Sequence, residues 1–219
     1  MDLTKLLSLL ETRKLFFPRS DKFEDLYEGA ESRATISEML KSGMSKELVE
    51  KFICSSEKQK QKMFISCWHM SEHESAAIWN LYLKTSEGIA IRSDHDTLCQ
   101  ELINSNYMAR TSIVKYIDYD KTVIPADNSL FLFLHKRLSF AHENELRAII
   151  WSLEDKNLNL ISLQADSVSV DINPENLIKA IHIAPNAPQW FSELVEQLIA
   201  RYGLRCPIER SNLYDRPTY

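Results

Sequence analysis

The order of apolar and polar positions along the chain predicts a mixture of short helices and short strands. Leu3, Leu6, Leu7 and Leu10 recur at helical spacing, which predicts an amphipathic helix at the start of the sequence. The segment MFISCW, residues 63–68, is mostly apolar, which is typical of a buried strand. Both kinds of pattern recur to the end of the chain.

The same patterns and the turn residues between them predict the other elements. Strands are expected in residues 14–18, 88–93, 111–120, 145–151, 160–163, 167–172, 178–184 and 207–211. Helices are expected in residues 74–85, 94–104, 130–138 and 188–203, and as two short helices within residues 23–62, on either side of Gly43. The expected N-terminal caps are Ser37, Ser45, a capping box of Ser71 with Glu74, and Asp94.

The order of these elements predicts the fold class. Strands and helices do not alternate strictly, and several strands alternate apolar with polar residues, so we expect an α+β fold with a mixed, largely antiparallel central sheet flanked by helices. The chain contains no internal repeat and no linker rich in proline or glycine. We therefore expect one domain over residues 1–219.

Composition narrows the classes of function. The net charge of −5 provides no general attraction for nucleic acid. The four glycines form neither a dinucleotide-binding nor a P-loop motif. No signal peptide and no apolar stretch of membrane-spanning length is found. The four cysteines form no CxxC pair, so we expect reduced, mostly buried thiols in a cytoplasmic protein.

The segment SFAHENELRAII, residues 139–150, is the strongest candidate for chemistry. If it is a strand, Glu143, Glu145 and Arg147 share one face, while Leu146, Ala148 and Ile150 face a core. Two acids and a base in a row fit either an active site or a solvated strand face with an ion pair.

Other candidates lie outside this strand. Arg19 and Arg92 follow or end predicted strands, where an arginine suits contact with phosphate or carboxylate, although for either one alone a surface ion pair is the favoured explanation. Trp68, Trp79 and Tyr82 fit either a pocket that stacks a ring or a hydrophobic core. His69 and His73 are spaced i, i+4, but His69 precedes the predicted helix, so no metal site is expected.

Several segments taken together resemble a bacterial family known as domain of unknown function number twenty-nine seventy-one. The resemblance covers residues 14–213. In chain order it rests on LFFPRSDKFEDLYEG, FISCWHMSEHESAAIWNLYLKTSEGIAIRS, VKYIDYD, HKRLSFAHENELRAII, IHIAPNAPQW and ERSNLYDRP. The order of an early arginine, central aromatic residues and a late strand glutamate also resembles the ADP-ribosyltransferases, more weakly.

These resemblances imply an NAD-consuming enzyme that acts as a toxin or an anti-phage defence effector. Glu145 would stabilise the oxocarbenium-like ribose, and Glu143 would orient or deprotonate the acceptor. Arg19 would hold the pyrophosphate and Tyr82 would stack on nicotinamide, with Trp79 and Arg92 completing the residues that contact NAD. The implied partners are a protein or nucleic-acid acceptor and an antitoxin or defence protein, with no membrane.

Two other functions remain open at this point. A magnesium-dependent nuclease would use Asp25, Glu28, Glu143 and Glu145 as ligands. A non-enzymatic module would instead bind a peptide or a nucleotide in an aromatic cleft.

Overall fold

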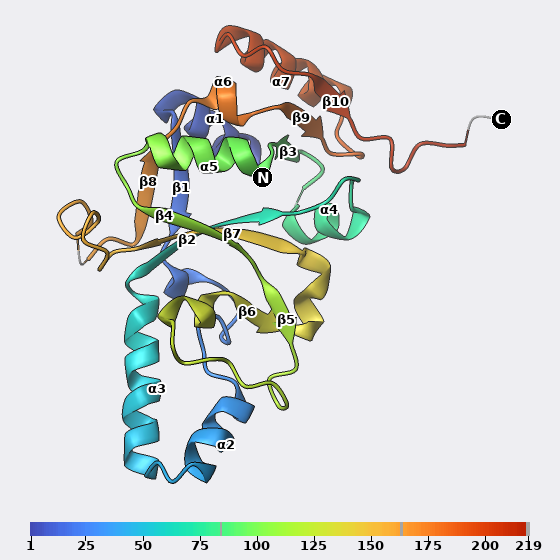
Figure 1. Ribbon diagram of the computed structural model, residues 1–219. Coiled ribbons are helices and arrows are strands. Elements are labelled where there is room, and N and C mark those ends of the chain that lie inside the picture. The colour runs from blue at the N-terminus through green and yellow to red at the C-terminus, as the bar shows by residue number, and fades with distance from the viewer. Residues whose placement is uncertain (84, 163, 218–219) are drawn as a thin grey trace. The chain divides into compact units, whose positions relative to one another are not determined.

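The chain has an α+β fold, described in a computed structural model for residues 1–83, 85–162 and 164–217 (Figure 1). It divides into two compact units. Unit 1 consists of Met1–Phe16, Ser71–Asn106 and Ser169–Tyr219, and unit 2 of Phe17–Met70 and Tyr107–Val168. Two of the four unit boundaries fall inside paired strands, β1 (Lys14–Pro18) and β8 (Ser167–Asp171). The expectation of one domain stays a prediction.

Unit 1 contains a three-stranded mixed sheet and several helices. The sheet has the order β10 (Ile208–Arg210), β9 (Ala180–Ile183), β3 (Ile89–Arg92), with β10 parallel and β3 antiparallel to β9. Its helices are α1 (Leu3–Thr12), α4 (Ala76–Tyr82), α5 (His95–Asn104), α6 (Pro174–Leu177) and α7 (Gln189–Arg201).

Unit 2 is organised around an antiparallel sheet whose central strand is β7 (Glu145–Trp151). Its neighbours are β2 (Met63–His69) and β4 (Ala109–Ile113). In this register Glu145 lies opposite His69, and Arg147 lies between Cys67 on β2 and Ser112 on β4. Directly paired residues share one face of a sheet, so these five side chains lie on the same face.

Both faces of β7 are buried. Leu146, Ala148 and Ile150 lie in the core, which confirms the prediction for this face. On the opposite face, Arg147 is 0% exposed and Glu145 is 3% exposed. The interpretation of this face as a solvated ion pair is therefore wrong.

The polar end of this face continues into a hydrophobic cluster. The cluster includes Met63, Ile65 and Ile149 from the sheet, together with Phe133 and Tyr119 from the segments that cover it. A charged group at the adjoining positions must therefore be paired inside the protein.

Two short strands and three 3₁₀ helices adjoin this sheet in unit 2. Strands β5 (Lys115–Ile117) and β6 (His135–Arg137) pair in parallel. The 3₁₀ helices are η1 (Ser20–Lys22), η2 (Ser129–Phe133) and η3 (Leu138–Glu143). Helices α2 (Arg33–Lys41) and α3 (Lys46–Lys60) follow one another at the other end of the unit (Figure 1).

Most predicted elements are present, and the differences have identifiable causes. The segment 111–120 is divided at Val114, because Val114 N–H still donates to Glu145 of β7 whereas Lys115 N–H donates to Leu134. The segment 130–138 is a 3₁₀ helix followed by strand β6 instead of one helix, because its second half pairs with β5. Residues 160–162 form turns instead of a strand, and residue 163 lies outside the described residues.

Two of the predicted caps are wrong. The hydroxyl of Ser71 donates to the carbonyl of His73 and closes a local turn, so the cap of α4 is Ser75. Ser32, not Ser37, caps α2. The caps Ser45 and Asp94 are confirmed.

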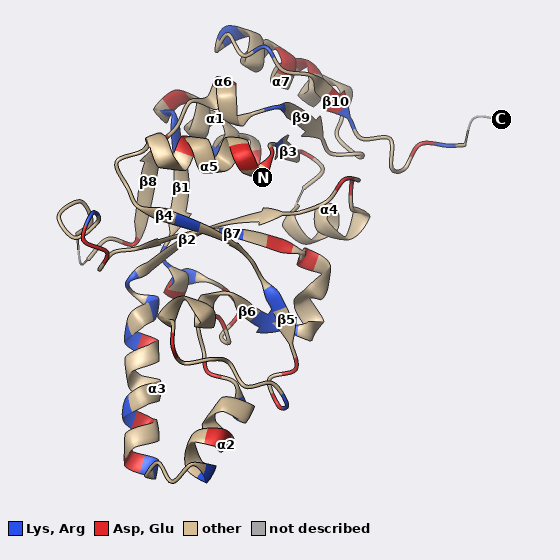
Figure 2. Ribbon diagram, in the orientation of Figure 1, with Lys and Arg blue, Asp and Glu red and all other residues tan. Residues whose placement is uncertain are grey.

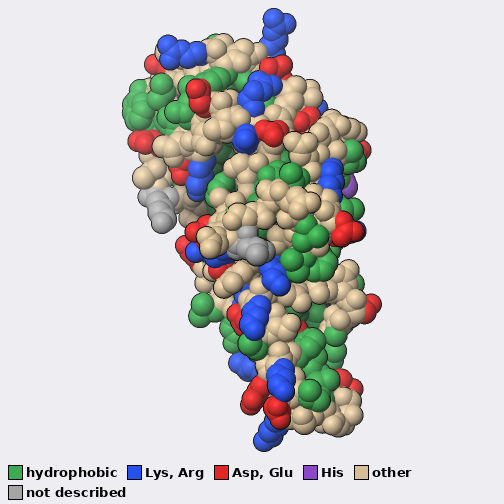
Figure 3. Space-filling model, turned by 90° about the vertical axis from the view of Figure 1, so that its left-hand side faces the viewer, with side chains coloured by type: hydrophobic (Ala, Val, Ile, Leu, Met, Phe, Trp, Pro, Cys, Tyr) green, Lys and Arg blue, Asp and Glu red, His purple; other side chains and the backbone are tan. Residues whose placement is uncertain are grey.

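Charges of both signs are distributed along the surface. Lysines and glutamates are interspersed on α3 (Figure 2), and the face in Figure 3 shows acidic, basic and hydrophobic side chains side by side. Within the described residues, no helix has both the length and the apolar character needed to cross a bilayer.

A tight turn at Gly29 packs closely against the ring of Phe133. Gly29 has φ +66°, and a Cβ there would lie 2.5 Å from Cε1 of Phe133, whereas Gly43 has φ +91° with open space around it. We expect Gly43→Ala to cost about 1–2 kcal/mol of backbone strain. Gly29→Ala should cost roughly 1–3 kcal/mol more through overpacking, as measured by urea unfolding. Equal losses in the two variants would contradict this packing.

Candidate functional site

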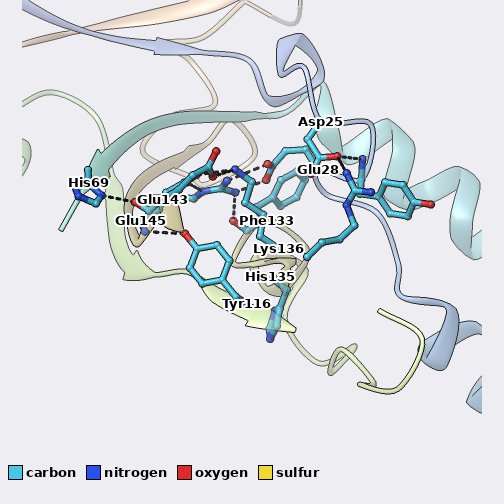
Figure 4. Close-up of polar contacts among 12 residues, drawn as sticks. Asp25, Glu28, His69, Tyr116, Phe133, His135, Lys136, Glu143 and Glu145 are labelled. Atoms are coloured by element: carbon cyan, nitrogen blue, oxygen red, sulfur yellow. Dashed lines mark hydrogen bonds and ion pairs between the residues drawn. The ribbon is translucent and has the colours of Figure 1, made fainter. Parts of the chain in front are cut away.

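Five charged side chains form one buried cluster in unit 2 (Figure 4). We call the following residues the ionic cluster: Glu28, Lys136, Glu143, Glu145 and Arg147. None of them is more than 7% exposed. The cluster holds three acids and two bases, and such a set is stable in the interior only when each charge is paired.

Arg147 is the centre of the cluster. Its Nε–H donates to Oε2 of Glu145 over 2.6 Å, and its two terminal nitrogens donate to the two carboxylate oxygens of Glu28, with 3.0 Å between Nη2 and Oε2. Its Nη1 also donates to the carbonyl of Phe133 over 2.7 Å. The guanidinium geometry therefore fixes two carboxylates from distant segments.

Lys136 joins the two acids that the sequence singled out. Its Nζ donates to Oε1 of Glu145 over 2.8 Å and to Oε2 of Glu143. The ammonium also lies 4.8 Å from the centre of the Phe140 ring. Glu145 thus receives Lys136 on one oxygen and Arg147 on the other, and it is fully engaged.

The pKa values of the two neighbouring carboxyl groups, Glu143 and Glu145, are shifted in opposite directions. Burial and a hydrogen bond to Glu145 raise the pKa of Glu143 to about 7, although Lys136 opposes this shift. Burial also favours a raised pKa for Glu145, but the charge of Arg147 and hydrogen bonds from Glu143, Arg147 and Lys136 lower it below the usual range. Near neutral pH, Glu143 therefore exchanges its proton readily while Glu145 remains ionised.

Glu143 does not lie on the strand, contrary to the sequence prediction. It ends η3, and Asn144 then adopts a left-handed conformation with φ 40° before β7 begins at Glu145. Met70 N–H donates to the Asn144 carbonyl, and Nδ1 of His69 lies 2.6 Å from the Glu143 carbonyl. This turn places the two carboxyl groups beside Lys136.

The face that carries the cluster reaches solvent at one edge. Cys67 and His69 are exposed and share this face with Glu145 and Arg147. Surrounding protein nevertheless raises the pKa of the Cys67 thiol. Cys67 therefore places an exposed thiol at the border of the site. With Cys54 also exposed, the expectation of mostly buried cysteines is wrong.

A second ion pair and a pocket adjoin the cluster. Arg137 donates to Oδ1 of Asp25 over 2.8 Å, and its guanidinium lies 4.1 Å from the Tyr27 ring centre and 5.1 Å from that of Phe140. A pocket of about 280 Å³ opens beside it. The pocket is lined by Tyr27, Arg33, Ile117, Asp118, Tyr119, Asp120, Arg137, Leu138 and Ser139.

The structure brings together only part of the predicted site. Glu143 and Glu145 meet at Lys136. Arg19, although in the same unit, is bound by Asp21 at 2.7 Å and Asp166 at 3.0 Å, which is the ion-pair alternative considered from the sequence. Trp79, Tyr82 and Arg92 belong to unit 1, so their grouping with the acids stays a prediction.

The sequence did not predict the partners that hold the site together: it offered Glu28 only as a magnesium ligand, and Tyr116 had no predicted role. Glu28 pairs with Arg147 across 119 residues, and the Tyr116 hydroxyl accepts the Glu145 backbone N–H over 2.9 Å. Lys136 was noticed only as part of a resemblance. The available signal was a lysine close in sequence to two acids, but which residues Lys136 pairs with depends on the tertiary fold.

The proposed nuclease ligands are held by basic side chains. Asp25 pairs with Arg137, Glu28 with Arg147, and Glu143 with Lys136. In the described part of the chain, no group of three or more His, Cys, Asp or Glu side chains is arranged to hold a metal ion.

Comparisons with known proteins found no match to this chain among protein-family models, curated proteins or solved structures. The resemblance described from the sequence therefore stays a prediction. The function has to be argued from the ionic cluster and its surroundings.

Arg147→Met tests whether the cluster depends on one guanidinium. Removing it leaves Glu28 and part of Glu145 buried without a counter-charge, so we expect a loss of about 3–5 kcal/mol in urea unfolding. Arg110→Met is the matched control, because Arg110 lies on β4 and its own side chain is about half exposed where it pairs with Glu154. That variant should lose only about 0–1 kcal/mol. Similar losses in both would contradict the assignment.

Glu143→Gln tests the raised pKa without assuming any activity. A raised pKa contributes stability that is complete below the unfolded value near 4.5 and is lost as the pH rises through about 7. Glutamine has no such loss, so the melting temperature of the variant should rise relative to the parent between pH 5 and pH 8. A constant difference over this range, as expected for Glu47→Gln on the exposed surface of α3, would refute the shift.

Proposed function

We propose that this protein cleaves the bond between nicotinamide and ribose in NAD and transfers the ADP-ribosyl group to an acceptor. The observation that carries this proposal is the pair Glu143–Glu145, two adjacent carboxyl groups whose pKa values are shifted apart around one lysine. Such pairs provide one ionised group and one proton-exchanging group at neutral pH, which is the requirement of chemistry at a glycosidic carbon.

The reaction can be written with these two groups. The C1′–N bond to nicotinamide breaks and its electron pair leaves with the neutral ring. The ribose passes through an oxocarbenium-like state, and fixed negative charge stabilises it. The acceptor forms a new bond to C1′ while its proton passes to the carboxylate of Glu143.

The geometry supports a division of roles between the two acids. Both oxygens of Glu145 are bound, by Lys136 and Arg147, so its negative charge is held in place. Glu143 is somewhat less buried and has the pKa near 7 that suits a general base. We therefore assign proton transfer to Glu143 and electrostatic stabilisation to Glu145, the division of roles that the resemblance also implies.

Arg137 is better suited than Arg19 to hold the pyrophosphate. It follows Lys136 directly, it lines the pocket in the same unit as the acids, and its guanidinium is half-buried between Tyr27 and Phe140. Arg33 lines the same pocket and, like Arg137, is paired with an aspartate, but its side chain is 70% exposed. Arginine next to a pocket is suited to bind phosphate oxygens.

This activity is consistent with the toxin or defence role that the resemblance implies, with a protein or nucleic-acid acceptor. The magnesium-dependent nuclease is less well supported, because its four carboxylates are already paired with bases. A binding module without catalysis would not need the pKa values of Glu143 and Glu145 to be shifted apart.

The test is cleavage of NAD labelled in the nicotinamide ring, measured as release of free nicotinamide. Glu143→Gln should lower the rate by about 10²–10³, the usual cost of one preorganised electrostatic contact. Glu154→Gln is the control, because Glu154 is a largely buried, paired carboxylate of the same unit outside the cluster. Equal rates in parent and Glu143→Gln, or no cleavage by the parent with any acceptor in a cell lysate, would sink the proposal. Glu145→Gln should also be inactive, but its melting temperature must be compared, since it leaves Arg147 partly unpaired.

The pH dependence provides a separate prediction. Because the base must be deprotonated, the rate should rise with pH through an apparent pKa near 7 and then level off. The residual rate of Glu143→Gln should lack this rise. A rate that falls through pH 7 would assign the proton-donating role to Glu143 instead.

A further inference from the structure

Unit 1 contains a pocket that the proposed reaction does not use. Its volume is about 260 Å³. The lining residues are Trp79, Asn80, Leu83, Thr85, Ser86, Ala184, Pro185, Asn186 and Tyr214. They come from α4, from the approach to β3, from the end of β9 and from the segment after β10.

Two aromatic residues form part of the pocket, and local contacts fix the segments that carry them. The Nε1–H of Trp79 donates to Oε2 of Glu74 over 2.9 Å, so the indole is oriented. Tyr214 is 47% exposed. Its segment is tied to the sheet where Ser211 N–H donates to the carbonyl of Ile183 over 2.9 Å.

The apolar wall is also determined by packing. Leu83 lies against Gly88, where a Cβ would come within 2.3 Å of the leucine Cδ2. The absence of a side chain at Gly88 therefore lets Leu83 pack directly against the backbone there. Ala184 N–H donates to the Gly88 carbonyl over 3.0 Å, which joins this wall to the end of β9.

The polar groups of the pocket are uncharged. Asn80 and Asn186 are exposed, and neither side-chain amide makes a hydrogen bond to any residue that the structure describes. Thr85 and Ser86 add hydroxyls, and no described lining residue carries a formal charge near neutral pH. Each amide offers both donors and an acceptor to a ligand.

We propose that this pocket binds a planar, uncharged heteroaromatic ring that carries amide or amine groups, such as a nucleobase or nicotinamide. The exposed ring of Tyr214 provides the stacking surface, whereas Trp79 is only 8% exposed and forms part of the buried wall. The amides pair with the polar edge of the ring. The pocket volume of about 260 Å³ lies below the roughly 300–1,000 Å³ of pockets for drug-sized ligands and is enough for one ring. This site lies in the unit without the acid pair and goes beyond the proposed reaction.

The experiment uses the full chain with adenosine and, separately, nicotinamide as probes, and measures binding by saturation-transfer NMR and titration. Tyr214→Ala should weaken binding of the ring that belongs here by roughly 5- to 150-fold, the range found when a stacking aromatic is removed. Tyr214→Phe keeps the ring and should bind within about threefold of the parent. Trp190→Ala is the control, because Trp190 is an exposed aromatic of unit 1 on α7, outside the pocket.

The outcomes separate the ligand sources and the two proposals. Binding of adenosine alone assigns a nucleobase, and binding of nicotinamide alone assigns the carboxamide ring. No binding of either probe at millimolar concentration, or binding unaffected by Tyr214→Ala, overturns the inference. If the parent protein binds a probe in this pocket but leaves NAD intact, the proposed reaction is refuted and this inference stands.

Discussion

The structure of unit 2 depends on one buried guanidinium. Arg147 is 0% exposed and reaches two carboxylates and a backbone carbonyl at once. A cation at this depth is tolerated only with paired charges and satisfied donors, and replacing the whole set of buried charges by hydrophobic residues of similar volume would be about as stable. The arginine, set beside Ile149 and Phe133, therefore serves position more than stability. What it positions is Glu145, and through Lys136 also Glu143.

The acid pair gains its character from a surplus of negative charge. Three carboxyl groups face two cations, so full ionisation would leave one buried charge without a partner, and the energetically least costly solution is a shared proton. Arg147 secures the ionised form of Glu145, and the proton stays with Glu143. A pair that exchanges one proton near neutral pH is an arrangement that surface ion pairs do not provide.

Local patterns predicted local structure well. The periodicity of residues 189–201 and the cap at Asp94 depend on neighbours in sequence, and both are confirmed. The single helix predicted for residues 130–138 is wrong because the second half of this segment pairs with β5. No local sequence signal contains that contact. The site shows the same limit. Alternation placed Glu145 and Arg147 on one face, but burial of that face and the partner Glu28 depend on contacts between distant segments.

The distance between Glu28 and Arg147 along the chain has a consequence for synthesis. The two residues are 119 positions apart, so at about 5–20 residues per second Glu28 leaves the ribosome roughly 6–24 s before its partner is made. During that interval the acid has no counter-charge, and the segment that carries it cannot be buried without cost. The N-terminal part of unit 2 therefore has to wait, solvated or held by a chaperone, until β7 has been translated and the sheet can close around the arginine.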